Sequence, residues 1–205
     1  EQYGISIRQL MENAGYQIAA YIRQEHSQDQ QIDIHVGKGH NGGDGLVAAR
    51  RLAGWGFNVS ISLITSNLGG IPADELATLQ QLDIPISKSM HDGDIIVDGL
   101  IGYSLSGAPR PPFDTRIQEI NDSSSHVVSI DVPSGVDAQT GEQLDPHIKA
   151  DTTVTLGLPK KGMTETNSGN IWVADIGIPR KAYQQAGIET GNPFHQQSLI
   201  QYTDR

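Results

Sequence analysis

The residues most able to do chemistry lie in a glycine-rich stretch, GKGHNGGDG, at positions 37–45. It holds an amide, Asn41, and a carboxylate, Asp44, beside the imidazole of His40. A β-branched run precedes the stretch and a helix-like apolar pattern follows it, which predicts strand, turn and helix. Glycine permits close approach of the backbone, and a helix start offers unpaired N–H groups and a positive dipole end. The expected ligand is therefore a phosphate or pyrophosphate.

Two common nucleotide-binding motifs fit this stretch poorly. The phosphate-binding loop of NTPases closes on Gly-Lys-Ser/Thr, where this chain has Gly45 and Leu46. Three glycines do match G-x-G-x-x-G, but the strand expected at residues 58–64 ends without an Asp or Glu for a ribose. A redox dehydrogenase is thus disfavoured, although not excluded. Structural roles also stay open: Asp44 could only cap the helix, and Asn41 could only tolerate a left-handed turn.

The composition is that of a globular protein. At 205 residues, 37% hydrophobic and 19% charged, the chain has the size of one domain with a substantial core. A formal net charge of −10 disfavours a nucleic-acid-binding surface, and no apolar run approaches transmembrane length. The absence of cysteine excludes disulfides, thiolate zinc sites and a cysteine nucleophile. With no visible secretory leader, the expected location is the cytoplasm.

Alternating strand and helix patterns predict the elements that position these candidate residues. A capping box, Ser6 and Gln9, opens a helix expected to end near His26, whose apolar face recurs at helical spacing. This face consists of Ile7, Leu10, Met11, Ala14, Ile18 and Ile22. Further helices are expected at 72–82 and 111–121, and further strands at 58–64, 95–97, 126–131, 151–156 and 169–175. The alternation predicts an α/β fold with a mostly parallel sheet and helices on both faces.

Polar side chains follow two of the buried strands. Asp98 ends one strand and Asp131 the next, and the rule that ligands bind at the carboxyl ends of parallel strands brings both to the rim that holds the glycine turn. Two carboxylates there would repel each other unless a cation, a proton or hydrogen bonds compensate them. Asn41, Asp98 and Ser134 offer oxygen ligands only, which favours an alkali ion over zinc, copper or iron. Capping of neighbouring turns is the alternative role for the aspartates.

The seven histidines show no metal-binding spacing, and each is expected at the surface or in a turn. They are His26, His35, His40, His91, His126, His147 and His195.

Five motifs, in order, resemble the YjeF N-terminal family, the NAD(P)H-hydrate epimerases that interconvert the R and S forms of hydrated NADH and NADPH. The motifs are LMENAG at 10–15, GKGHNGGDG at 37–45, VDGLIG at 97–102, SIDVPSGVD at 129–137 and TVTLGLPKKGM at 153–163. The resemblance spans nearly the whole chain and implies a three-layer, Rossmann-like fold. The family usually has asparagine where this chain has His40, which leaves the contact at that position open.

The resemblance also implies a site. Potassium is the implied ion, with Asn41, Asp98 and Ser134 as its ligands. The implied contacts to the hydrated dinucleotide come from the glycine turn, the loop after Asp98, and two further residues. They are His40, Asn41, Gly42, Gly43, Asp44, Gly102, Tyr103, Ser104, Leu105, Ser106, Gly107, Ala108, Asp131 and Lys160.

Asp131 is the expected general acid–base group, because epimerisation needs a group poised over the hydrated carbon of the ring. A non-catalytic nucleotide-binding or scaffold protein of the same fold is the alternative function. We expect a single domain over residues 1–205, a homodimer, and no nucleic-acid or membrane partner. The chain does not begin with methionine, so we also expect a fragment of a bifunctional enzyme with a dehydratase domain.

Overall fold

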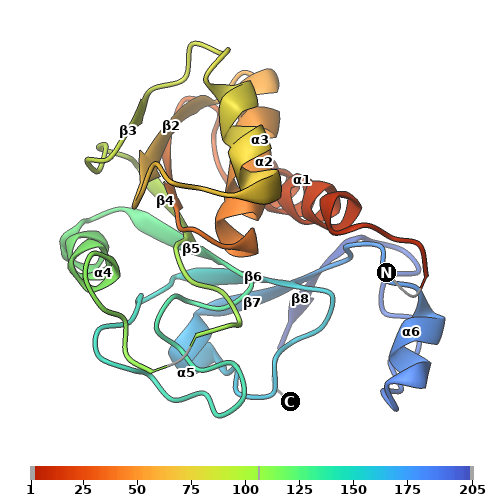
Figure 1. Cartoon of the computed structure of the whole chain (residues 1–205). Helices are drawn as coiled ribbons and strands as arrows, with labels where there is room; N and C mark the ends of the chain where they lie inside the picture. Colours follow the sequence, from red (N-terminus) through yellow and green to blue (C-terminus); the bar gives the residue numbers. More distant parts are fainter. Residues whose placement is uncertain (1–2, 106, 204–205) are drawn as a thin grey trace.

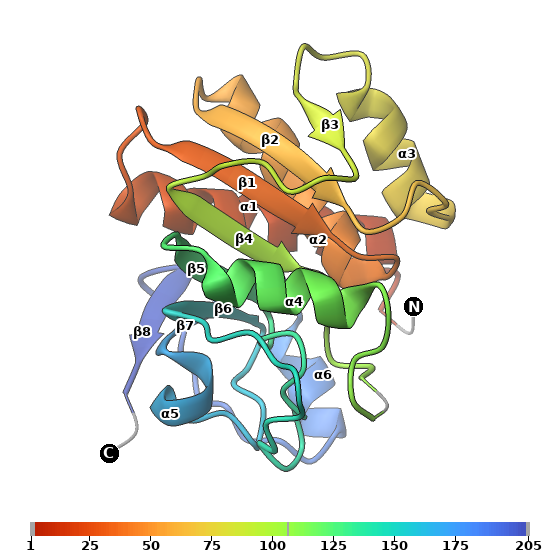
Figure 2. The ribbon, with the colours of Figure 1, turned by 90° about the vertical axis from the view of Figure 1, so that its left-hand side faces the viewer.

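The computed structural model describes residues 3–105 and 107–203. Its centre is one eight-stranded sheet with the order β3-β2-β1-β4-β5-β6-β7-β8 (Figures 1 and 2). The strands are β1 (Gln31–Val36), β2 (Asn58–Leu63), β3 (Ile86–Ser87), β4 (Ile95–Gly99), β5 (His126–Ile130), β6 (Thr152–Leu156), β7 (Asn170–Ala174) and β8 (Leu199–Tyr202). Neighbouring strands are parallel except β8, which pairs antiparallel with β7.

Helices cover both faces of this sheet, so the predicted three-layer α/β fold is confirmed. One face carries α1 (Ile7–Glu25), α2 (His40–Gly54) and α3 (Gly70–Leu79), and the other carries α4 (Phe113–Asp122) and the short α5 (Glu165–Ser168) (Figures 1 and 2). The helix α6 (Arg180–Gln185) lies beside the N-terminal end of the chain (Figure 1). No helix of the described residues is long and apolar enough to cross a membrane.

The sequence predicts the long elements well and misses the short ones. All the expected strands form, with bounds shifted by one residue or two, and the expected helix at 72–82 begins and ends earlier, as α3. The strands β3 and β8 and the helices α5 and α6 are not predicted, because segments of two to six residues are too short to display a period. These missed elements lie mostly at the β8 end of the sheet.

The helix α1 begins with the predicted capping box. The Ser6 side chain accepts from the backbone N–H of Gln9, and the Gln9 side chain accepts from the backbone N–H of Ser6. Most of the predicted apolar face is buried, including Ile18 and Ile22 at 0% exposure. Ile7 is an exception at 43%, because it is the first residue of the helix and the sheet does not reach it.

Two apolar cores hold the layers together. The larger lies between the sheet and the helices α1, α2 and α3, and takes alternate residues of the central strands, such as Ile32, Ile34 and Val97. The smaller lies between the sheet and α4, and includes Ile96, Leu100 and Ile117 together with Val127. Because parallel strands are buried on both faces, their sequences are nearly continuously apolar.

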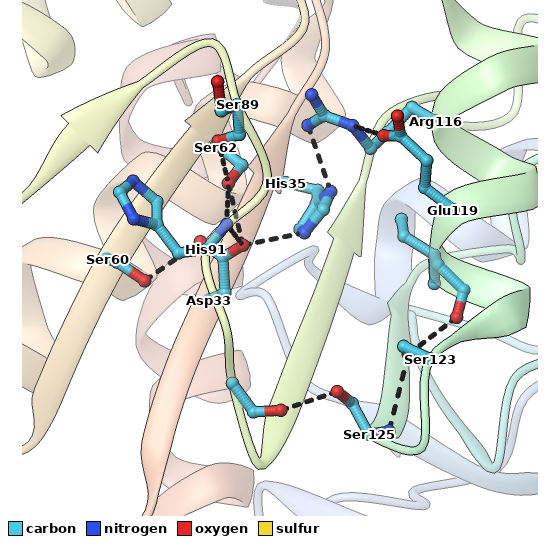
Figure 3. Close-up of polar contacts among 12 residues, drawn as sticks. Asp33, His35, Ser60, Ser62, Ser89, His91, Arg116, Glu119, Ser123 and Ser125 are labelled. Atoms are coloured by element: carbon cyan, nitrogen blue, oxygen red, sulfur yellow. Dashed lines mark hydrogen bonds and ion pairs between the residues drawn. The ribbon is translucent and has the colours of Figure 1, made fainter.

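A buried polar cluster lies on β1, on the face of the sheet that α4 covers (Figure 3). His35 is fully buried, so the prediction of a surface position is wrong for this histidine. Its Nε2 lies 2.9 Å from Asp33 Oδ2, and its Nδ1 lies 3.4 Å from Nη1 of Arg116, which reaches across from α4. A strand buried on both faces can accept a histidine when its neighbours supply polar partners, which the sequence pattern does not reveal.

The same cluster keeps Asp33 ionised. Burial by itself raises the pKa of this carboxyl, but the contact with His35 and hydrogen bonds from Ser62 and the His91 backbone outweigh it and leave the pKa below its usual value. Ser60 donates to the other carboxylate oxygen at 3.0 Å. The polar groups of this cluster find most of their partners within it, which marks the cluster as structural.

We expect Ile18→Ala to lower the free energy of unfolding by about 2–5 kcal/mol, because it leaves a cavity in the larger core. The matched control is Ile7→Ala on the same helix, expected to cost less than about 0.5 kcal/mol since Ile7 is exposed. Urea unfolding followed by circular dichroism measures both. Equal losses would contradict the assignment of the α1 face.

Candidate active site

A cavity opens at the carboxyl ends of β1, β4 and β5. Its volume is about 520 Å³, within the usual range for small-molecule sites. The glycine turn, the loop after β4 and single residues of three further segments line it. These residues are Lys38, Gly39, His40, Asn41, Asp44, Leu100, Ile101, Gly102, Tyr103, Ser104, Leu105, Phe113, Asp131 and Leu156.

The backbone of the glycine turn packs closely against neighbouring backbone, and this packing forms part of the cavity wall. A Cβ placed on Gly37 would lie 1.8 Å from the carbonyl oxygen of Leu100, and one placed on Gly42 would lie 2.3 Å from that of Gly37. Neither position could hold a side chain without moving β4 or α2. Gly39 is different, since a Cβ there would meet nothing within 4 Å.

The amino end of α2 faces the cavity without a side-chain cap. Its N-cap residue is Gly39, which makes no side-chain hydrogen bond, and the first turn carries no acidic residue. Both structural alternatives are therefore wrong: Asp44 lies in the second turn and does not cap, and Asn41 is helical. The exposed helix N–H groups and the nearby Lys38 favour an anion at this end of the cavity.

Asp131 follows β5 in a left-handed backbone conformation, with φ of 67°. For a residue other than glycine this costs on the order of 1 kcal/mol. Its Oδ1 accepts from the Leu156 N–H at 3.0 Å and forms an ion pair with Lys160 Nζ. Lys160 Nζ also donates to Thr155 Oγ1 and to the Leu156 carbonyl, each at 3.0 Å. The ammonium group thus fixes the Asp131 carboxylate at the edge of the cavity.

The environment of the Asp44 carboxyl group differs from that of Asp131. It is 7% exposed, and no hydrogen bond from a described residue reaches its carboxyl group. Burial raises the pKa of Asp44 well above its usual value, and the negative charge of Asp131 raises it further. Two carboxyl groups of one cavity therefore differ in electrostatic environment, one paired with a cation and one desolvated.

Asp98 lies near the carboxyl end of β4 and is fully buried. Its Oδ1 accepts from Ser134 Oγ at 2.6 Å and from the Leu100 N–H at 3.2 Å. Its Oδ2 accepts from Ser129 Oγ at 2.8 Å and from the Ser134 N–H at 2.9 Å. Burial raises the pKa of Asp98, and these hydrogen bonds oppose the rise.

Two of the three expected potassium ligands, Asn41 and Ser134, contact the short segment at residues 101–102, and the third, Asp98, accepts a hydrogen bond from Ser134. Ser134 Oγ accepts from the Ile101 N–H at 2.8 Å, and a Cβ on Gly102 would lie 3.2 Å from Asn41 Oδ1. The Asn41 amide is buried and its Nδ2 has no hydrogen-bond partner within the described chain. One carboxylate, one hydroxyl and one amide fit a singly charged, oxygen-preferring cation. No group of three His, Cys, Asp or Glu among the described residues could hold a metal ion.

Most of the predicted contact residues line the cavity, but several do not. Gly42 and Gly43 are buried inside the packing of α2, and Lys160 lies behind Asp131. Gly107 and Ala108 lie beyond the lining, and Ser106 is outside the described residues.

The cavity also has lining residues that the sequence analysis did not select. Lys38 belongs to the glycine turn, and Leu100 and Ile101 come two and three residues after Asp98, so the strand-end rule could have found all three. Phe113 and Leu156 come from other elements, and only the folded chain brings them to the cavity.

Fold and cavity together define a Rossmann-like α/β protein with a candidate small-molecule site at the strand ends. A family model described as YjeF-related protein N-terminus matches residues 7–162. An NAD(P)H-hydrate epimerase of Dehalogenimonas lykanthroporepellens is 35% identical over 99% of this chain and 86% of its own length. The chain therefore belongs to the YjeF N-terminal family.

Two further relatives extend the comparison. A bifunctional NAD(P)H-hydrate repair enzyme of Hyperthermus butylicus is 35% identical over 91% of this chain, which spans only 37% of that enzyme. The crystal structure of the yeast protein ynu0 superposes with a TM-score of 0.84 at 27% identity, covering 98% of this chain and 92% of the yeast chain. The Rossmann-like architecture is thus common to this chain and a solved structure.

We expect Asp98→Asn to lower the free energy of unfolding by about 2–3 kcal/mol in potassium-free buffer. Each carboxylate oxygen accepts from one backbone N–H, so in either orientation the new amide NH₂ faces a backbone donor. Urea unfolding measures the loss, with Asp122→Asn on the exposed end of α4 as the control. Wild-type stability of Asp98→Asn would contradict the hydrogen-bond pattern around the Asp98 carboxylate.

Proposed function

We propose that this chain interconverts the R and S forms of hydrated NADH and NADPH, as an NAD(P)H-hydrate epimerase. The family supports this, since the relative from Dehalogenimonas carries that name and matches nearly the whole chain. The observation that carries the proposal is the pair Asp44 and Asp131 in one cavity beside an uncapped helix end. This arrangement combines an anion site with proton-transfer groups.

The substrate is held mainly by its diphosphate. The amino end of α2 presents backbone N–H groups at the cavity, and Lys38 adds an exposed positive charge. This grip is independent of the stereochemistry of the nicotinamide ring, so both epimers bind in one way. Tyr103, 55% exposed on the loop after β4, offers an aromatic face to a flat ring of the substrate.

The reaction takes place at the hydrated carbon of the nicotinamide ring. Hydration of an enamine double bond places the hydroxyl on the carbon bound to nitrogen, because the nitrogen lone pair stabilises the cation at that carbon. Asp131 acts there as a general acid–base group, and the Lys160 ion pair holds its carboxylate in place. Positioning of this group over the carbon supplies much of the rate enhancement.

A scaffold function is the weaker proposal. Burying Asp44 near Asp131 and holding Asp131 in a left-handed conformation both cost stability. A protein that only displays a surface gains nothing from either feature, whereas a catalyst uses both.

We further propose that Asn41, Asp98 and Ser134 hold potassium. The support is a fully buried carboxylate with no cationic partner among the described residues, and the oxygen atoms of Asn41 and Ser134 beside the segment at 101–102. When bound, the ion would supply positive charge at the carboxyl ends of the strands. With or without the ion, Asn41 packs against Gly102 and Ser134 forms hydrogen bonds with the backbone of Ile101. These contacts order the segment at 101–102.

Other expectations remain predictions. These are a single domain over residues 1–205, a homodimer, a cytoplasmic location and a fused dehydratase domain. The bifunctional relative, of which this chain spans 37%, supports the last of them.

The first test concerns Asp131. We expect Asp131→Asn to lower the turnover of purified S and R hydrates by about 10²-fold or more, since it keeps size and polarity but removes the proton acceptor. Chromatography of the two epimers measures the rate, and Asp92→Asn, an exposed carboxylate away from the cavity, is the control. Equal rates would remove Asp131 from the mechanism, and inactivity of the parent in potassium buffer would favour the scaffold.

The second test concerns potassium. Replacing NaCl by KCl at constant ionic strength should raise the thermal midpoint of the parent by about 3–6 °C at ten times Kd, because the ion binds only the folded state. Asn41→Ala should abolish this shift while Asp92→Asn retains it. Identical midpoints of the parent in the two salts would refute the site.

A further inference from the structure

Within the part of the chain that the structure describes, the Asp44 carboxyl group has no hydrogen-bond or ion-pair partner. It lies in the second turn of α2, is 7% exposed, and receives no hydrogen bond from the described residues. Buried carboxylates are usually surrounded by hydrogen-bond donors, as Asp98 is by Ser129 and Ser134. An unsatisfied buried carboxyl is costly, so its place in the cavity wall calls for a ligand-directed role.

Asp131 shares the cavity with Asp44 and is compensated differently. Lys160 pairs with Asp131 from behind, and the Leu156 N–H adds a hydrogen bond at 3.0 Å. No positively charged side chain forms an ion pair with Asp44 in the described structure. Pairs of carboxyl groups with contrasting environments commonly divide the roles of acid and base between them.

The proposed epimerisation, on which this inference rests, needs two proton transfers. The hydroxyl must leave one face of the ring as water, and a water molecule must add to the other face. A group on only one side would have to serve both faces.

We propose that Asp44 is a second catalytic residue of the epimerisation, acting on the ring face opposite to Asp131. In one direction Asp44 donates its proton to the departing hydroxyl, the carbon–oxygen bond breaks, and the nitrogen lone pair forms a carbon–nitrogen double bond. Water then forms the new carbon–oxygen bond on the other face, Asp131 takes its proton, and the electron pair returns to nitrogen. Nothing is oxidised or reduced, and the reverse direction exchanges the two roles.

The starting protonation states follow from the environments. Burial and the charge of Asp131 raise the pKa of Asp44, so Asp44 is the group that holds a proton while Asp131 is ion-paired. The other titratable or charged groups at the cavity are Lys38, His40 and Tyr103, with Lys160 behind Asp131. Within the described chain, none of these forms a hydrogen bond or ion pair with Asp44, so none replaces it as the proton donor.

The experiment measures epimerisation of purified S and R hydrates by the parent, Asp44→Asn, Asp44→Glu and Asp92→Asn in potassium buffer. We expect Asp44→Asn to lower kcat by about 10²-fold or more, and Asp44→Glu to recover part of that loss because it keeps an acid. The thermal shift produced by NADP⁺ should persist in Asp44→Asn, because the diphosphate grip lies at the start of α2. Asp92→Asn should match the parent.

Two further measurements separate catalysis from structure. The parent rate should fall as pH rises past the pKa of Asp44, since the proton donor is then lost, and Asp44→Asn should lack this alkaline decline. In H₂¹⁸O, epimerisation by the parent should carry the heavy oxygen into the product, and Asp44→Asn should lose both processes together.

The outcomes are distinguishable. An active parent with an equally active Asp44→Asn overturns the role of Asp44 and leaves the proposed function standing. Loss of the NADP⁺ shift together with activity makes Asp44 a binding residue, which also overturns the proposal. If Asp44→Asn fails to fold, Asp44→Glu and the pH profile of the parent decide. An inactive parent overturns the proposed function and this inference with it.

Discussion

The approach of Gly37 to Leu100 is the constraint on which the site depends. The chain leaving β1 packs on the chain leaving β4 so closely that a Cβ at Gly37 would lie 1.8 Å from a carbonyl oxygen. This contact sets where α2 begins, and so aims its N–H groups at the cavity. It also brings Asn41 against Gly99 and Gly102, next to the buried Asp98. A larger residue at Gly37 would separate the two strand ends and disperse every group of the site.

Three carboxyl groups lie close together at the strand ends of a protein of net charge −10: Asp98 and Asp44 are buried, and Asp131 is half-buried. Hydrogen bonds surround Asp98, an ammonium group pairs with Asp131, and Asp44 has neither kind of partner among the described residues. The hydrogen bonds fix the Asp98 carboxylate in place, whereas the Asp44 carboxyl group is left for a ligand in the cavity. Active sites commonly retain such unfavourable electrostatics at the expense of stability.

The sequence predicts the large features because they rest on periodicity and on glycine. The strands before Asp98 and Asp131 are nearly continuous apolar runs, and the turn at 37–45 is readable from composition alone. Pairing between distant residues is not readable in this way. The repulsion expected between Asp98 and Asp131 instead falls on Asp44 and Asp131, because Asp131 turns in a left-handed conformation that no pattern announces. His35 was misplaced for a related reason, since Arg116 comes to it from a helix 81 residues away.

Gly39 has a practical consequence. It stands at the mouth of the cavity with φ of −91°, a value that any residue adopts, and space is open where a Cβ would lie. The chain contains no cysteine, so a thiol introduced at this position would be unique in it. A fluorophore or spin label attached there would sit beside an arriving dinucleotide without background labelling. Most enzymes require their native thiols to be removed before such a probe can be installed, whereas this chain begins in that state.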